Sequence, residues 1–226
     1  MELLNSEVKR IRNELAVGLQ SVRRYNGRYK EIRVDGATLS AIGAIAIVHP
    51  DPVGWKENAR YVRDLGTTIE ENSQKLGRKA YDATKLPYEQ LVDVLAGNKP
   101  AGLPDSEPTM PFSDHADRGG LMKRMDMAKE WLKQNVHTDA VFKQQRDKVR
   151  HEASLLAVLG AVIADKSYDS ADEKGYAAHA REMIAAARAM VAAVKSENFT
   201  GFTAALGRVD KKCDECHVDY RFKDDN

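Results

Sequence analysis

A stripe of apolar residues at the start of the chain constrains its fold more than any other feature of the sequence. Its members alternate in spacing between four and three residues: Leu4, Val8, Ile11, Leu15, Leu19 and Val22. This spacing puts them on one face of an α-helix, and that face must be buried against neighbouring elements. The same spacing returns 117 residues later, in Leu121, Met125, Ala128, Leu132 and Val136. We therefore expect two copies of one helical unit.

The similarity between the two halves extends into the helices that follow. At the same offset, three residues of one apolar run are identical to their counterparts: Leu39, Gly43 and Ala44 match Leu156, Gly160 and Ala161. Further along, the offset between the halves increases by one residue to 118, and Arg63-Asp64-Leu65 then matches Arg181-Glu182-Met183. A glycine inside a helix costs about 1 kcal/mol relative to alanine. We therefore expect Gly43 and Gly160 to lie where two helices cross closely in each half.

The composition of the long segments favours helices throughout the chain. These segments are rich in alanine, leucine, lysine, glutamate and arginine, which are strong helix formers, and aromatic residues make up only 7% of the sequence. Short connections between consecutive helices place neighbours antiparallel. The expected fold class is all-α, with two tandem antiparallel four-helix-bundle-like units that arose from an internal duplication.

Proline and glycine mark the expected boundaries. Residues 98–118 contain four prolines among polar residues and have no sustained period, which predicts a linker between a first repeat over 1–97 and a second over 119–226. In the first repeat we expect a helix that ends near Asn26-Gly27, helices over about 28–48 and 55–76, and a short helix after Pro87. In the second we expect helices near 119–135, 139–165, 171–195 and 198–221.

Charge and hydropathy exclude several classes of function. Lys and Arg number 35 and Asp and Glu 34, so the net charge of +1 gives no field that selects nucleic acid or anionic lipid. The longest apolar stretch, Leu155–Ala164, has ten residues, whereas a helix needs about 20 to cross a bilayer. The sequence contains no paired carboxylates, nucleophile–base set or phosphate-binding loop. We expect no nucleic-acid partner, no membrane span and no enzymatic turnover.

Both cysteines of the chain lie in one motif near the C-terminus, Cys213-Asp214-Glu215-Cys216-His217. This is CxxCH, the attachment motif of a c-type haem. Two thiols three residues apart on a helix lie one turn apart on the same face, where both can form thioethers with the vinyl groups of one porphyrin. His217 follows directly, so its ring can reach the iron. Two cysteines are too few for a disulfide framework, a four-cysteine zinc site or an iron–sulfur cluster.

Two other interpretations use the same cysteines. A redox-active CxxC sits at the start of a helix, where the helix dipole lowers the pKa of a thiol, but this motif lies at the end of its helix. A zinc site needs two further ligands, and the remaining histidines show no pairing at a spacing of three to five residues. The motif therefore favours one covalent haem c, with zinc and the dithiol as the alternatives.

The longer pattern CxxCHxxYR, here Cys213 to Arg221, resembles the class II cytochromes c, the cytochrome c-prime family. The resemblance covers about residues 139–221. It includes Leu159-Gly160-Ala161-Val162 and the Tyr168-Asp169 that follows, which are similar to the end of that family's first helix and its next loop. The resemblance implies thioether bonds at Cys213 and Cys216, proximal ligation of the iron by His217, and haem contacts from Tyr220 and Arg221. Arg221 is implied to lie near a propionate, and it is equally interpreted as a cation that completes the helix dipole.

The residue on the other side of the iron decides between electron transfer and gas binding, because a second strong ligand closes the iron and an apolar residue leaves it open. By the resemblance, this distal position falls within residues 148–152. Val149 would leave the iron open to diatomic gases such as NO or CO, and His151 would close it. Further candidates are Met122, Met125 and Met127 on the preceding helix, together with Met110, Met183 and His179. Met125, Met183 and His179 replace apolar or aromatic residues of the first repeat, which favours packing roles.

We expect a monohaem c-type cytochrome that carries single electrons between extracytoplasmic redox partner proteins. The alternatives are a gas-binding haem protein and a scaffold whose haem is structural. Thioether attachment of haem normally occurs outside the cytoplasm, so a periplasmic or otherwise extracytoplasmic location is expected. Because Met1-Glu2-Leu3-Leu4 leads directly into an amphipathic helix, we expect that a signal peptide has been removed.

Overall fold

The computed structural model describes residues 1–99 and 102–221, and every regular element within these ranges is a helix. The expected all-α class is therefore confirmed. None of the described helices combines the length and the apolar character needed to cross a membrane. The chain separates into two compact units, the N-terminal unit Met1–Leu121 and the C-terminal unit Met122–Asn226. Each unit is described by itself.

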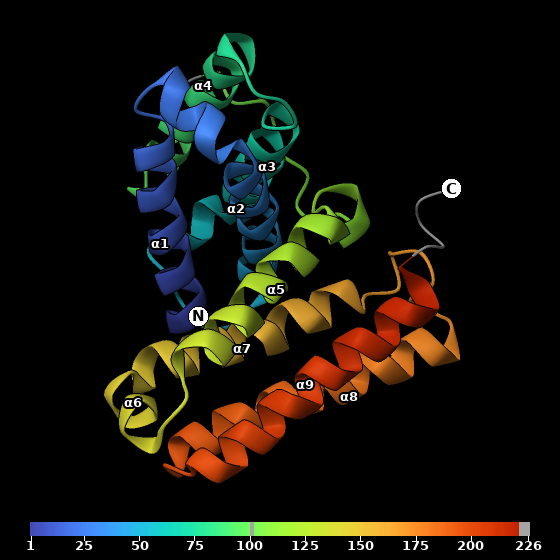
Figure 1. Cartoon of the computed structure of the whole chain (residues 1–226). Helices are drawn as coiled ribbons and strands as arrows, with labels where there is room; N and C mark the ends of the chain where they lie inside the picture. Colours follow the sequence, from blue (N-terminus) through green and yellow to red (C-terminus); the bar gives the residue numbers. More distant parts are fainter. Residues whose placement is uncertain (100–101, 222–226) are drawn as a thin grey trace. The chain divides into compact units, whose positions relative to one another are not determined.

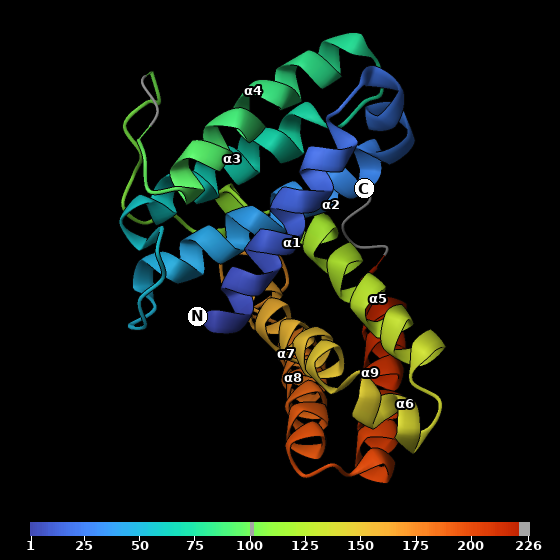
Figure 2. The same cartoon turned by 90° about the vertical axis from the view of Figure 1, so that its left-hand side faces the viewer.

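The N-terminal unit contains four α-helices: α1 (Glu2–Gly18), α2 (Val22–Val48), α3 (Ala59–Asn72) and α4 (Arg78–Leu95). The 3₁₀ turns η1 (Lys56–Asn58) and η2 (Phe112–Asp114) complete it. Helices that are consecutive in the chain pack against one another, most extensively α2 against α3, as the blue to green ribbons of Figures 1 and 2 show. The apolar stripe is buried from Leu4 to Leu19 as its spacing predicted, whereas its last member, Val22, begins α2 and is half-buried.

The closest backbone approach in this unit is between α2 and α3, and it depends on glycine. A side chain added at Gly66 would come within 2.5 Å of the backbone nitrogen of Ser40, and one added at Gly43 would overlap the backbone at Arg63. The expected close crossing at Gly43 is therefore confirmed. Its counterpart Gly160 differs, because a side chain there would meet the flexible Met183 side chain rather than backbone.

Two expected boundaries in this unit are wrong. Asn26 and Gly27 lie inside α2, and the break falls earlier because the Ser21 side chain caps α2 by accepting a hydrogen bond from the Arg24 backbone nitrogen at 3.3 Å. Pro87 lies inside α4 instead of preceding a short helix. Proline removes one backbone hydrogen bond from a helix. Here the helix continues because Pro87 and the following Leu91 are buried against its neighbours.

The segment interpreted as a linker is attached to the N-terminal unit in its described part. The Arg63 guanidinium in α3, which is fully buried, donates to the Glu107 carbonyl at 2.7 Å and to the Ser106 hydroxyl at 3.1 Å. The His115 ring lies 2.9 Å from the Ser40 hydroxyl in α2. These contacts explain why the boundary between the units falls at Leu121, inside α5 (Arg118–Asn135), and not at the start of the proline-rich segment.

The C-terminal unit continues along α5 and adds α6 (Asp139–Gln144), α7 (Arg146–Ile163), α8 (Lys174–Lys195) and α9 (Phe199–Tyr220). The helix expected over 139–165 is interrupted at Gln145. In this unit α8 packs closely against both α7 and α9 (Figure 2), whereas the backbone of α5 approaches none of the three as closely. Side chains bridge that wider separation, among them the buried ion pair of Arg124 with Glu152 at 2.9 Å.

Candidate functional site

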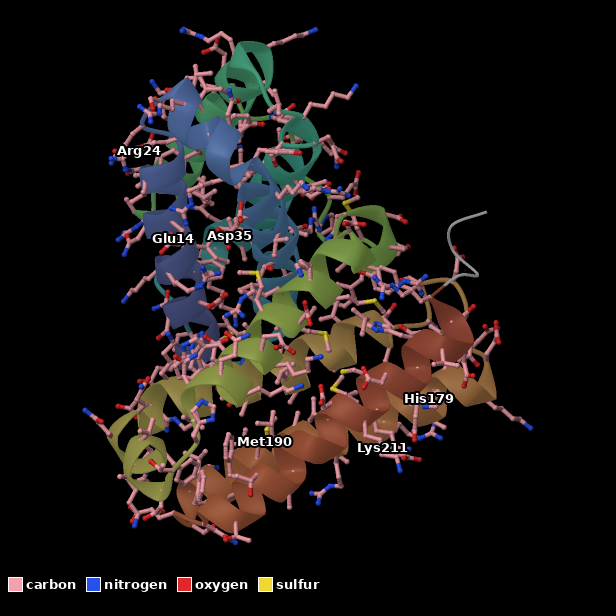
Figure 3. The ribbon with its side chains drawn as sticks, viewed as in Figure 1. Glu14, Arg24, Asp35, His179, Met190 and Lys211 are labelled. Atoms are coloured by element: carbon pink, nitrogen blue, oxygen red, sulfur yellow. The ribbon has the colours of Figure 1, made fainter. Side chains whose placement is uncertain are left out.

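The CxxCH motif lies on α9 and faces a pocket within the C-terminal unit. Most of its lining carries sulfur or an imidazole: Met122, Met125, Met183, Cys213, Cys216, His179 and His217. The remainder is apolar or charged: Ile163, Tyr176, Ala180, Asp126, Lys129 and Lys212. Figure 3 shows sulfur atoms, in yellow, in the space between α5 and the helices α8 and α9. The structure thus brings Cys213, Cys216 and His217 together with residues from three other helices.

The start of α9 sets the orientation of the motif. The Asn198 side chain caps the helix by accepting a hydrogen bond from the Gly201 backbone nitrogen at 2.8 Å. Phe202 and Val209 are fully buried, and this face of the helix leads to Cys213 one turn beyond Val209. At the opposite wall, the Tyr176 hydroxyl donates to the Ile163 carbonyl at 2.8 Å and fixes the start of α8 against the end of α7.

The two thiols are half-buried and form no disulfide. Burial raises the pKa of Cys213 to about 11, and the nearby Lys129 offsets only part of this effect. The thiol is therefore protonated at neutral pH. A redox-active dithiol has the opposite property, a lowered thiol pKa. This environment does not fit the dithiol interpretation.

The imidazole of His217 is half-buried at the edge of the pocket. Burial lowers its pKa, and the positive charges of Arg221 and Lys129 add to that effect. The ring is thus favoured in its neutral form, which has a lone pair for a metal. Its backbone carbonyl accepts a hydrogen bond from the Arg221 backbone nitrogen at 3.1 Å, but within the described residues its ring has no hydrogen bond or ion pair.

The zinc interpretation lacks ligands. Across the described ranges, no three or more His, Cys, Asp or Glu side chains come close enough to hold one metal ion. A structural zinc site needs four such ligands in a tetrahedron. Cys213, Cys216 and His217 belong to one short helical segment, and among the described residues no other such side chain joins them closely enough to complete a zinc site.

Tyr220 and His179 form the wall behind the motif. The Tyr220 ring packs edge-on against Tyr176 at 5.4 Å and against His179 at 6.3 Å between ring centres. His179, labelled on α8 in Figure 3, also lies 3.0 Å from an Asp219 carboxylate oxygen through Nε2. His179 lines the pocket while Tyr220 supports that lining. Arg221 is exposed at the end of α9.

The proposed distal residues are placed differently from the expectation. Val149 is fully buried in α7 and His151 is half-buried two residues later, and neither lines the pocket with the motif. The residue that α7 contributes is Ile163, at its other end. Three methionines line the pocket instead, whereas Met127 is 39% exposed and Met110 belongs to the N-terminal unit. The sequence signal that could have identified the two α5 methionines is the spacing of three residues between Met122 and Met125, which places both on one face of a helix.

Two lysines place positive charge at the pocket. Lys129 is 12% exposed and lies 3.2 Å from Asp210 and 3.6 Å from Asp126, whereas Lys212 lies 2.6 Å from Glu182 and 2.7 Å from Glu215. Hydrogen bonding to Glu182 and Glu215 raises the pKa of Lys212, so the ammonium is held in its charged form. The pocket therefore combines an apolar, sulfur-rich interior with two lysines that are each paired with carboxylates of the chain.

Comparison with known proteins adds no further information about the site. No family model matches the chain, and no curated protein or solved structure matches it significantly.

Proposed function

We propose that this protein is a monohaem c-type cytochrome that carries single electrons between redox partner proteins. The observation that carries the proposal is the CxxCH motif of Cys213, Cys216 and His217, which faces an apolar pocket rich in methionine. The proposal makes the protein an electron carrier and not an enzyme.

The residues present fit a haem. Cys213 and Cys216 would hold it through two thioethers, and the neutral His217 imidazole would ligate the iron. The apolar walls would suit the faces of the macrocycle. When bound, the haem supplies a one-electron redox centre.

The side-chain sulfurs of Met122 and Met125 favour electron transfer over gas binding, because either sulfur could be a second ligand of the iron. Both belong to α5 and line the pocket on the same helical face. The methyl end of Met183 packs against α7 at Gly160, so the two α5 methionines are the residues that would supply a second ligand to the iron. A Met and His pair closes the iron and raises its reduction potential, as in other electron-carrying haem proteins. His151 does not line the pocket, so we propose Met122 or Met125 in its place.

The test is an absorption spectrum of the full chain produced together with haem-attachment machinery. We expect a c-type spectrum that is low-spin in both oxidation states and does not change when carbon monoxide is added to the reduced protein. The double substitution Cys213→Ala and Cys216→Ala should abolish covalent haem. Wild-type protein without a Soret band would overturn the haem proposal. A high-spin spectrum that shifts with carbon monoxide would keep the haem but replace electron transfer with gas binding.

We also propose that the two units arose by duplication, because paired contacts recur at the offset found in the sequence. Arg10 joins Glu7 to Asp35 in the N-terminal unit, with two distances of 2.8 Å. The residues 117 positions after Glu7 and Asp35 are Arg124 and Glu152, which form their own ion pair. In each unit an ion pair thus links the first helix to a later one, α1 to α2 in the N-terminal unit and α5 to α7 in the C-terminal unit.

An aromatic pair recurs in the same way. The rings of Tyr25 and Tyr81 lie 6.0 Å apart between α2 and α4. Phe142 follows Tyr25 by 117 residues and Phe199 follows Tyr81 by 118, and their rings lie 5.7 Å apart. The step from 117 to 118 agrees with the slip of one residue between the halves.

The same correspondence accounts for a first repeat without haem. Leu95 stands at the position of Cys213, and Asn5 at the position of Met122. The Asn5 side chain accepts a hydrogen bond from the Trp55 indole nitrogen at 3.0 Å, and Trp55 is 4% exposed. We infer that Trp55 fills the space in the N-terminal unit that corresponds to the pocket of the C-terminal unit.

The proposed location is the periplasm or another extracytoplasmic compartment. Its support is the attachment chemistry, since thioether bonds to haem are normally formed outside the cytoplasm. Fractionation of cells that express the full-length gene product, with haem staining of each fraction, tests it. Haem-stained protein confined to the cytoplasm would contradict the location and leave the electron-transfer proposal in place.

A further inference from the structure

A positively charged groove lies in the C-terminal unit where α6 meets α7 and α8 ends. Five cations and one carboxylate line it: Lys143, Arg146, Lys148, Arg150, Lys195 and Asp147. All six are exposed. The chain as a whole carries a net charge of only +1, so the positive charge of this groove is a local feature that negative charges elsewhere in the chain nearly balance.

Among the described residues, three of the five cations have no carboxylate partner. Lys143 lies 2.7 Å from Asp139 and Arg146 lies 3.0 Å from Glu197. Within the part of the chain that the structure describes, Arg150 and Lys195 form no ion pair, and Lys148 rests over the Trp131 ring at 4.1 Å without one. Charges that are unpaired within the chain are available to a partner.

The surroundings of these cations point to an acidic protein segment. Besides the charged residues, the groove is lined by Gln144, Gln145 and Val194. It presents no aromatic ring on which a nucleic-acid base could stack. Val194 is buried, so the groove has no exposed apolar side chain that could enter a lipid layer. The glutamine amides can donate hydrogen bonds to carboxylates.

We propose that this groove binds an Asp- and Glu-rich segment of a partner protein. The groove is remote from the cofactor pocket, because Lys195 ends α8 whereas Tyr176, at the pocket, is near its start. The 19 residues between them span about 28 Å of helix. A partner held in the groove therefore leaves the pocket uncovered. The inference does not depend on the haem and goes beyond the proposed electron transfer.

The test uses the full chain and a fluorescently labelled hexaglutamate peptide, with binding followed by anisotropy. We expect binding at about 0.05 M salt that weakens strongly at about 0.5 M, because salt screens exposed charges. Replacing the three unpaired cations (Lys148→Glu, Arg150→Glu and Lys195→Glu) should weaken binding by about tenfold or more. The matched control (Lys166→Glu, Lys174→Glu and Arg188→Glu) changes the net charge equally, on exposed residues outside the groove, and should change binding less than about twofold.

Three outcomes would overturn the proposal. Equal loss in both triple variants would mean that only the overall charge attracts the peptide, and no loss in either would mean that the groove is not the site. Tighter binding of a single-stranded RNA or of anionic vesicles than of the peptide would assign the groove to another class of partner. Circular dichroism checks the fold of each variant. If the glutamate triple unfolds, the corresponding glutamine triple is expected to weaken binding in the same direction.

Discussion

Arg124 in α5 and Glu152 in α7 form an ion pair at 2.9 Å that is almost completely removed from solvent, with side-chain exposures of 4% and 8%. It links α5 directly to α7 within the C-terminal unit. A buried charge that loses its partner is costly, typically about 3–5 kcal/mol. The pair therefore fixes the position of α5, the helix that carries Met122 and Met125.

Glu152→Ala should lower the free energy of unfolding of the C-terminal unit by about 3 kcal/mol or more, because it leaves the Arg124 guanidinium buried without its carboxylate. Urea unfolding followed by circular dichroism measures the change. Glu197→Ala removes half of the exposed Arg146 pair and should cost less than about 1 kcal/mol. Equal effects of the two substitutions would show that the buried pair does not stabilise this unit.

Replacing the pocket methionines should change the haem spectrum. If Met122 or Met125 is the second axial ligand, its substitution by alanine converts the low-spin protein into a high-spin form that binds carbon monoxide. Met127→Ala is the control, since this methionine is exposed outside the pocket. Low-spin spectra in both the Met122 and Met125 variants, together with loss of the low-spin form in His151→Ala, would restore His151 as the ligand.

His115 predicts a pH dependence in the N-terminal unit. Burial and then the charge of Arg63 lower its pKa to about 4, whereas the unfolded chain takes up this proton near pH 6.5. Between these values the unfolded state binds more protons, so stability is complete above about pH 6.5. It falls by up to about 3 kcal/mol as the pH drops to about 4. His115→Gln should flatten this part of the profile, measured by urea unfolding at several pH values. An unchanged slope in the variant would assign the pH dependence to other groups.

The glycines of the helix crossings should respond differently to alanine. Gly43→Ala is expected to destabilise by about 2 kcal/mol or more because the new methyl group meets the α3 backbone. Gly160→Ala should cost less, since the Met183 side chain can move. Gly27 has open space around it inside α2, so Gly27→Ala should stabilise by about 0.5–1 kcal/mol. Thermal unfolding of the three variants measures their stability. Equal destabilisation by Gly160→Ala and Gly43→Ala would contradict the expected order.

The thiol of Cys213 should react slowly in protein that has received no haem. With a pKa of about 11, its reactive thiolate is rare at neutral pH. In a Cys216→Ala background, we expect alkylation by iodoacetamide about a hundredfold slower at pH 7.4 than in guanidinium chloride, with a rate that rises up to about pH 11. A rate that levels off near pH 7 would instead indicate an activated thiol and support dithiol chemistry.

The sequence predicted the features that depend on local periodicity. The stripes from Leu4 and from Leu121 are buried, and the His49-Pro50 dipeptide ends α2 as proline requires. The sequence did not predict helix boundaries that depend on tertiary packing or on a competing cap. The Ser21 cap begins α2 before Asn26-Gly27, the dipeptide at which the first helix was expected to end. Helix α4 accommodates Pro87 because the surrounding residues are buried.

Only the part of the candidate site that lies on α9 was predictable. The spacing of CxxCH places its members within one helix, so Cys213 and His217 could be named from the sequence. The opposite wall depends on how α5, α7 and α8 meet, which no local pattern encodes. Counting along α7 from a family resemblance led to His151, whereas the structure contributes Ile163 from that helix and Met122 and Met125 from α5.

On the proposed function, Trp55 and its Asn5 partner give the two units different requirements for maturation. The N-terminal unit would have a complete interior as soon as it folds, because the indole would occupy the space between its helices. The C-terminal unit would reach its final packing only after a group from outside the polypeptide has been added, and that group would then stabilise it as any tightly held ligand does. A newly made chain would therefore contain one unit with a complete interior and one unit that still requires its cofactor.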